Sequence, residues 1–166
     1  MKKIFKIFLS LLILLLGCAG TPTTSLYLLH IDNIPTQAEP ASIKVGIQPF
    51  TIDPIYSNHG IAYQQTPYQI QFYHYHQWAG DPAKMINQTL LTYFKEANNF
   101  SFVCQLPSLN EVDYRLQGKI LKFVEWNEAN QWFGWLELDV NISKEDTKEI
   151  IWKGQISKKV PTEKRN

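Results

Sequence analysis

The chain lacks the motifs by which the common enzyme classes are recognised. It has no Gly-x-Ser-x-Gly elbow, no phosphate-binding glycine loop, no Cys-x-x-Cys pair and no His-Glu-x-x-His sequence. Three of its aspartates, Asp53, Asp81 and Asp113, are scattered along the chain. Two carboxylates work as acid and base only where their surroundings separate their pKa values. The sequence therefore predicts that the protein is not an enzyme.

A surplus of charge is also missing. Lys and Arg number 16 and Asp and Glu number 15, which gives a net charge of +1. Without residues 1–17, which contain three lysines, the counts become 13 and 15 and the net charge becomes −2. Nucleic-acid binding depends on Lys and Arg that neutralise phosphates. A nucleic-acid partner is therefore not expected.

The chain has no apolar run long enough to cross a bilayer as a helix. Residues 4–16 form the longest such run, and its 13 positions fall short of the roughly 20 that a spanning helix needs. Lys2 and Lys3 precede this run and Lys6 lies within it. Gly17 and Cys18 complete the segment Leu15-Leu16-Gly17-Cys18 at its end. A basic start, an apolar segment and small residues before the cut are typical of an export peptide. The alternative to the lipoprotein signal described next is an ordinary secretory peptide with an incidental cysteine.

The sequence around Cys18 resembles a bacterial lipobox. This resemblance implies that residues 1–17 are removed and that Cys18 carries a covalent diacylglycerol and an N-acyl lipid, with no other cofactor. Two or more acyl chains hold a protein stably on a membrane. Ala19, where some lipoproteins have Asp, implies the outer membrane, facing the periplasm, rather than the inner membrane.

Cysteine is scarce, since Cys18 and Cys104 are the only two in the chain. An acylated Cys18 leaves Cys104 without a disulfide partner. Cys104 lies in an apolar run, where a free cysteine acts as a small hydrophobe more often than as a nucleophile.

The rest of the chain has the length of one domain. Residues 18–25 are mostly small and polar, as in a flexible tether, and residues 26–166 form a single domain. Asp81-Pro82 and the apolar spacing that follows predict an amphipathic helix over about residues 82–97. Alternating apolar residues predict strands at 43–47, 60–63, 68–76, 100–105, 113–126, 131–143 and 150–157. This order predicts an α+β fold with a mainly antiparallel sheet and the helix packed on one face.

A long hairpin is predicted from residues 113–126 and 131–143. If Lys119 lies opposite Glu137, the apolar residues of both strands share one face. The other face is then polar except near the tip, where four apolar residues gather. These are Leu121, Phe123, Phe133 and Trp135. Such a cluster is either covered by a neighbouring segment or forms a contact for a partner or lipid.

His74 and His76 are the residues most suggestive of a metal, because positions two apart on a strand share a face. A zinc site needs three or four protein ligands, and no third ligand follows at a useful spacing. Their alternation with tyrosines favours packing, so no metal site is predicted. A small hydrolase that uses either histidine is the weakest alternative function.

Five segments taken in order resemble the ABC-type transport auxiliary lipoproteins. They are Tyr27-Leu28, Ile43–Pro49, Gly60–Gln64, His76–Ala79 and Val112–Gly118. The resemblance implies a non-catalytic lipoprotein that works beside an ABC transporter and a mammalian-cell-entry (MCE) type substrate-binding protein. Such systems move lipids between the inner and outer membranes. It also implies that Trp78 packs where strand gives way to helix and that a central strand begins at Asp113-Tyr114.

The chain departs from this family in one respect. Its members usually end with a second amphipathic helix, whereas residues 158–166 are too short and too polar to form one. Three alternatives follow: part of the inner sheet face is open, a partner fills it, or the gene product is truncated. The alternative function is an outer-membrane assembly lipoprotein that acts as a plug or chaperone for another envelope protein.

Overall fold

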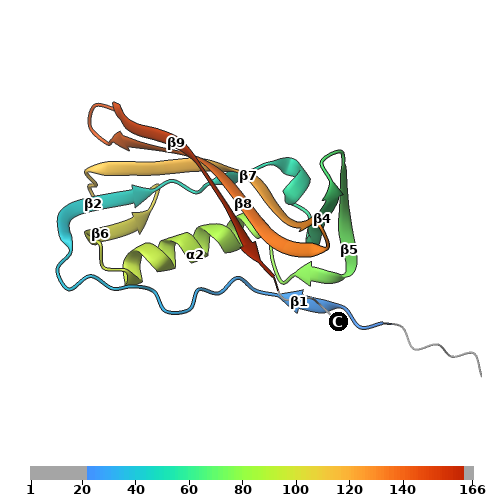
Figure 1. Ribbon diagram of the computed structural model, residues 1–166. Helices are drawn as coiled ribbons and strands as arrows, with labels where there is room; N and C mark the ends of the chain where they lie inside the picture. The colour runs from blue at the N-terminus through green and yellow to red at the C-terminus, as the bar shows by residue number, and fades with distance from the viewer. Residues whose placement is uncertain (1–21, 163–166) are drawn as a thin grey trace, which may run out of the picture.

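The computed structural model describes residues 22–162, so the predicted signal peptide and Cys18 lie outside the described residues. Within residues 22–162 the chain forms a nine-stranded sheet, one α-helix and one 3₁₀ turn (Figure 1). The elements are β1 (Ser25–Tyr27), β2 (Ala41–Ile47), β3 (Thr51–Ile52), η1 (Pro54–Tyr56), β4 (Gly60–Thr66), β5 (Gln69–Trp78), α2 (Pro82–Glu96), β6 (Phe100–Gln105), β7 (Tyr114–Glu128), β8 (Gln131–Lys144) and β9 (Ile150–Pro161).

Strand β7 is the axis of the sheet. Strand β8 pairs antiparallel with it from Tyr114 to Glu128, and β9 pairs antiparallel with β8. On the other side of β7 lie three short strands that follow one another along the same path: β2, then β3, then β4. The chain from residue 45 to residue 64 thus makes a single pass beside β7, in the same direction.

The prediction of a mainly antiparallel sheet is wrong, because the sheet is mixed. The pairs β4–β5, β7–β8 and β8–β9 are antiparallel. The pairs β1–β5, β2–β6, β2–β7, β3–β7 and β4–β7 are parallel. Parallel neighbours need a long crossover, and α2 provides one by bringing the chain from β5 to β6 beside β2. Alternation within a strand does not reveal the direction of its neighbour.

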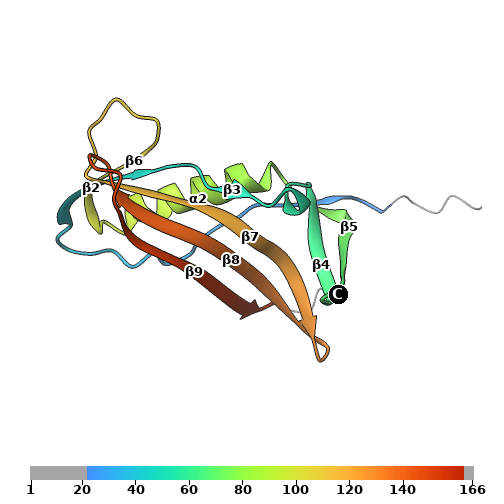
Figure 2. The same cartoon turned by 90° about the horizontal axis from the view of Figure 1, so that it is seen from above.

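Helix α2 begins where the sequence predicts. The Asp81 carboxylate accepts a hydrogen bond from the Lys84 backbone N–H at 2.9 Å, and Pro82 occupies the first turn. Ile86 is buried against the sheet, and Leu90 and Phe94 pack beside it. The helix covers the β2, β6 and β7 part of the sheet, while β8 and β9 diverge from it (Figure 2).

The sheet has two different faces. We call the face that packs on α2 the helix-side face; in β7 it includes the buried residues Leu116 and Ile120. The opposite, outer face carries a smaller core of Tyr56, Ala62 and Val124. A bulge in β7 separates the regions of the two cores.

Asn87 joins α2 to the segment that follows β2. Its Oδ1 accepts a hydrogen bond from the Phe50 N–H at 2.7 Å, and its Nδ2 donates to the Phe50 carbonyl oxygen at 3.0 Å. The Phe50 ring fills the space above Gly118, where a Cβ would lie 2.6 Å from the ring. This position in β7 therefore needs a glycine, and Phe50 is held both by its backbone and by its ring.

We expect Asn87→Ala to lower the free energy of unfolding by about 1–3 kcal/mol, because the Phe50 backbone groups lose their partners in a partly buried place. The neighbouring exposed residue supplies a control, since Gln88→Ala should change stability by less than about 0.5 kcal/mol. Urea unfolding of both variants measures the difference. Equal effects would mean that Asn87 does not link helix and sheet.

A group of ion pairs lies at the end of the sheet where β7 starts. The Arg115 guanidinium donates two hydrogen bonds of 2.8 Å to the Glu145 carboxylate, and Lys148 Nζ lies 2.6 Å from the same carboxylate. These hydrogen bonds, first from Arg115 and then from Lys148, lower the pKa of Glu145 from its ordinary 4.5 to about 2. The bidentate pair therefore joins β7 to the β8–β9 turn.

The pKa of Glu145 is lower in the folded chain, so its ion pairs stabilise the fold above pH 4.5 and this stabilisation is lost as pH falls toward 2. We expect Glu145→Gln to lower the free energy of unfolding at pH 7 and to have a smaller effect near pH 2. Denaturant unfolding across this range measures the difference. Glu111→Gln, in an exposed loop, serves as the control, and a pH-independent loss in Glu145→Gln would contradict the assignment.

Candidate functional site

The hairpin formed by β7 and β8 does not have the predicted register. Lys119 lies opposite Asp139 rather than Glu137, and the register shifts again between Ile120 and Lys122. A β-bulge adds one residue to one strand and exchanges the faces of all residues beyond it. Alternation in the sequence does not show where such an extra residue sits, and this is why the predicted register is wrong.

The four apolar residues at the hairpin tip therefore do not share one face. Leu121 lies at the bulge, and Phe123 pairs with Leu136 on the helix-side face. Trp135 pairs with Val124 and Phe133 pairs with Trp126, which places both on the outer face. The proposed grouping of Leu121, Phe123, Phe133 and Trp135 as one cluster is thus wrong in its geometry. Their role in contacting a partner or lipid stays a prediction.

Trp135 on the outer face has partners within the chain. Lys122 Nζ lies 3.5 Å and Lys159 Nζ 4.4 Å from the centre of its ring, within the range of cation–π attraction. Its Nε1 donates a hydrogen bond to Ser157 Oγ at 2.9 Å. Two lysine ammonium groups thus lie over this ring, so the outer face offers less apolar surface than the sequence suggests.

Phe123, on the helix-side face, belongs to an apolar groove between the tip of the β7–β8 hairpin, β4, β5 and the end of β9. Its ring stacks on Trp78 with a centroid distance of 4.8 Å, just before α2 begins. The expectation that Trp78 packs between strand and helix is thereby confirmed. The groove has a volume of about 390 Å³ and reaches the end of β9. It is lined by Ile61, Trp78, Phe123, Val124, Glu125, Gly134, Trp135, Leu136, Lys158, Val160 and Thr162.

Strand β9 continues this apolar surface along the sheet. Trp152, Ile156 and Val160 lie on its helix-side face and are 44%, 49% and 53% exposed. Residues 153, 155, 157 and 159 on the outer face are all polar. We call Trp152, Ile156 and Val160 the β9 face. Gly154 and Lys158 lie between these three residues on the same face. Exposed apolar side chains gathered on one face of a strand mark contact surfaces.

A second apolar groove lies at the other end of the same face. Its volume is about 330 Å³, and it opens between α2, β6 and the start of β9. Its lining consists of Ile43, Val45, Phe94, Phe100, Tyr114, Leu116, Ile142 and Ile151. Together the two grooves and the β9 face form an apolar surface that α2 leaves open. The spacing of Trp152, Ile156 and Val160, which puts all three on one face of a strand, could have revealed it in the sequence, where this segment is interpreted only as a strand.

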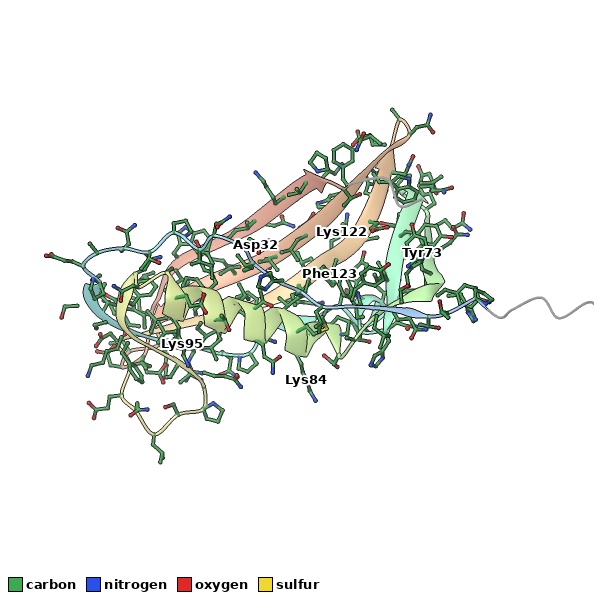
Figure 3. The ribbon with its side chains drawn as sticks, turned by 90° about the horizontal axis from the view of Figure 1, so that it is seen from below. Asp32, Tyr73, Lys84, Lys95, Lys122 and Phe123 are labelled. Carbon is green, nitrogen blue, oxygen red and sulfur yellow. The ribbon has the colours of Figure 1, made fainter. Side chains whose placement is uncertain are left out.

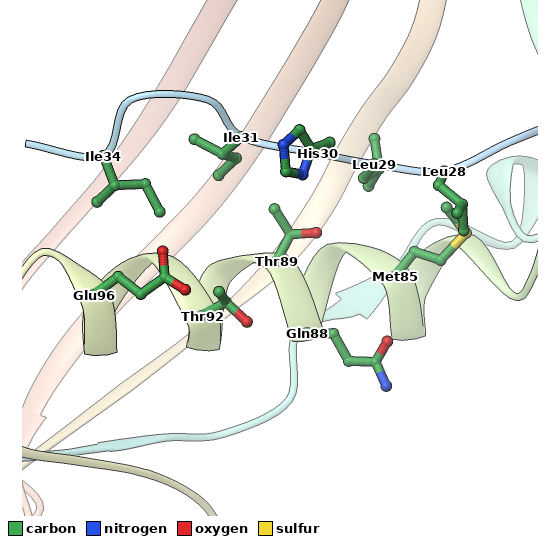
Figure 4. A pocket seen from close by; sticks show the side chains of 10 residues that line it. All are labelled: Leu28, Leu29, His30, Ile31, Ile34, Met85, Gln88, Thr89, Thr92 and Glu96. Carbon is green, nitrogen blue, oxygen red and sulfur yellow. The ribbon is translucent and has the colours of Figure 1, made fainter.

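A third cavity has a mixed lining. Residues 28–34 run beside α2 and enclose about 300 Å³, with Met85, Thr89 and Glu96 on the helix side (Figure 4). Leu29 packs on the core whereas Leu28 is largely exposed. The cavity thus lies between α2 and the segment that follows β1, where the two do not pack closely.

The two histidines of β5 make ring contacts. His76 Nδ1 and the Tyr27 hydroxyl lie 2.7 Å apart, and His74 packs edge-on against Tyr75 at 4.6 Å. In the described part of the chain, no three His, Cys, Asp or Glu side chains converge to hold a metal. Cys104 is a half-buried residue of β6, as expected for a small apolar side chain. No helix among residues 22–162 is long and apolar enough to cross a membrane.

Solved structures share this fold. The structure of protein XCC0632 from Xanthomonas campestris superposes with a TM-score of 0.76 at 16% identity and covers 86% of this chain and 81% of its own. A second structure, titled only as an uncharacterized protein, gives a TM-score of 0.64 at 12% identity and covers 87% and 84%. At these identities the likeness extends to the fold alone. No curated protein sequence gives a match.

A family model describes nearly the whole domain. The model for the ABC-type transport auxiliary lipoprotein component matches residues 27–164, a range that includes every segment from the end of β1 to the end of β9. The five segments that resemble this family in the sequence fall within the match. The chain therefore belongs to the family of ABC-type transport auxiliary lipoprotein components.

Proposed function

We propose that the chain is a non-enzymatic auxiliary protein of an ABC/MCE-type system that moves lipids between the inner and outer membranes. Lipid chains on Cys18 hold it at the periplasmic face of the outer membrane, and the domain acts by binding other components. Membership of the auxiliary lipoprotein family supports the link to a transporter. The lipobox around Cys18 and the Ala19 that follows it support the membrane location.

The observation that carries the binding role is the exposed β9 face. Trp152, Ile156 and Val160 point to the same side of the sheet, and Val160 lines the first apolar groove. Each retains about half of its surface for a partner, and burying that half contributes about 1 kcal/mol per side chain. The MCE-type substrate-binding protein is the partner that we assign to this face.

Acylation of Cys18 is the first test. We expect the mature protein to begin at Cys18, to carry diacylglycerol and an N-acyl chain by mass spectrometry, and to fractionate with the outer membrane. Cys104→Ala should behave in the same way, because Cys104 lies within β6. An unacylated chain released without detergent would refute the anchor, and recovery with the inner membrane would refute only the location.

The second test concerns the β9 face. We expect Ile156→Glu to reduce the recovery of MCE and transporter components in a membrane pull-down, because a charge would have to be buried in the interface. The combined loss of apolar contact and desolvation of the charge is at least about 2 kcal/mol, or more than roughly tenfold in affinity.

Lys153→Glu, on the outer face of the same strand, is the matched control and should leave recovery unchanged. Circular dichroism and thermal unfolding check that both variants fold. Equal recovery with both would remove the β9 face from the interface. Recovery of a β-barrel protein in place of transporter components would favour the plug or chaperone function.

A further inference from the structure

Residues 54–80 contain no Asp, Glu, Lys or Arg, although charged residues make up 19% of the chain. This segment forms η1, β4 and β5, so an entire hairpin of the sheet carries no formal charge apart from any proton bound to histidine. It is also rich in aromatic residues. They are Tyr56, Tyr63, Tyr68, Phe72, Tyr73, Tyr75 and Trp78. We call β4, β5 and their turn, residues 60–78, the aromatic hairpin.

Much of the aromatic hairpin faces solvent. Tyr68 in the turn is 96% exposed, and Phe72 and Tyr75 of β5 are also exposed. Exposed hairpins at the edge of a sheet usually carry charged side chains, lysine above all, which prevent unwanted association. A charged side chain loses its water when a contact buries it, and this desolvation costs free energy. An exposed hairpin without charged side chains avoids this cost and is therefore suited to forming a contact.

Ring contacts connect the hairpin to its neighbours. Tyr27 of β1 contacts His76 at a centroid distance of 5.7 Å, and His76 contacts Tyr73 at 5.5 Å. Tyr73 stacks on Tyr63 at 4.4 Å, and Tyr63 contacts Trp132 of β8 at 6.1 Å. These rings form a continuous row from the first described strand to the tip of the β7–β8 hairpin. The row holds the aromatic hairpin against β1 and the tip of the β7–β8 hairpin.

The same end of the molecule receives the chain from Cys18. Ser25 of β1 pairs with His76 of β5, and Tyr73 lies at the end of the domain where the described chain begins (Figure 3). Seven residue steps separate Cys18 from Ser25 and extend to about 24 Å at most. Strand β7 alone, with 15 residues, is about 50 Å long. An anchor at Cys18 therefore keeps the aromatic hairpin, and not the opposite end of the sheet, next to the bilayer.

We propose that the aromatic hairpin contacts the headgroup region of the bilayer in which the lipids on Cys18 are inserted. This inference rests on the acylation of Cys18 in the proposed function. Tyrosine and tryptophan favour the membrane–water interface because each has an apolar ring and a polar group. Because the tether holds the hairpin near the bilayer, the effective concentration of lipid around it is high. A weak intrinsic affinity of the hairpin for lipid is then sufficient to keep it bound. The bilayer thus binds the protein at two places, the acyl chains and the hairpin.

A fluorescent probe tests the contact in the full acylated chain. Tyr68→Cys and Leu109→Cys are each made in a Cys104→Ala background and labelled with an environment-sensitive dye. Leu109 is the matched control, because it is an exposed apolar residue in the loop between β6 and β7 at the opposite end of the domain (Figure 2). Both proteins are reconstituted in phosphatidylethanolamine–phosphatidylglycerol vesicles with and without brominated acyl chains.

We expect a blue-shifted emission at position 68 that brominated lipid quenches, and the emission of a probe in water at position 109. Emission typical of water at both positions, with the protein still bound to vesicles, would overturn the hairpin contact and leave the anchor intact. A blue shift at position 68 without quenching would indicate burial by a second copy of the chain and would also overturn it.

The Cys104→Ala background alone should not react with the dye. Labelling of Cys18 there would show a missing lipid and would refute the proposed function together with this contact.

Discussion

The pairing of β7 on both of its edges is the constraint on which the fold depends. Strand β8 occupies one edge along its whole length, and β2, β3 and β4 occupy successive parts of the other. Segments far apart in the sequence are thereby aligned on one strand, and Ile120 near its middle is completely buried. Interrupting β7 would separate the helix-side core from the aromatic hairpin.

The bulge after Ile120 divides this strand into two parts that contribute to different cores. Before it, Leu116 and Ile120 face α2 and form the main core. Beyond it the faces exchange, so Phe123 continues the helix-side face and meets Trp78, while Val124 enters the smaller core on the outer face. The bulge also increases the local twist of the sheet. Strands β8 and β9 can then leave the helix, and an apolar surface stays open.

The local elements could be predicted from the sequence because their signals are local. The cap at Asp81-Pro82 marked the start of α2, and alternation marked the strands at 43–47, 100–105 and the two arms of the long hairpin. Three-dimensional relations were harder to predict. The parallel pairing of β2, β3 and β4 with β7 depends on the crossover through α2, and the register depends on one extra residue at Leu121. Neither leaves a periodic trace in the sequence.

The candidate surface was predictable in part. The sequence contains the alternation that places Trp152, Ile156 and Val160 on one side of β9, but exposure depends on the position of α2, which the sequence alone does not give. The sequence predicts Phe123 in a tip cluster, but it lines the groove beside β9, because the bulge places it on the other face. The uncharged run of residues 54–80 is fully visible in the sequence. Only the structure shows that this run lies near the start of the domain, because β1 pairs with β5.

The two ends of the sheet differ in chemistry, and under the proposed membrane contact this difference would set the orientation of the molecule. At the start of β7, ion pairs of Arg115 and Lys144 with acidic partners suit a surface in water. At the other end the aromatic hairpin has no charged side chain to desolvate. Strand β9 runs between these ends, from Ile150 beside the ion pairs to Pro161 beside the tip of the β7–β8 hairpin. With the hairpin on the bilayer as proposed, the β9 face would extend away from the membrane, and a protein bound along it would be held on that side.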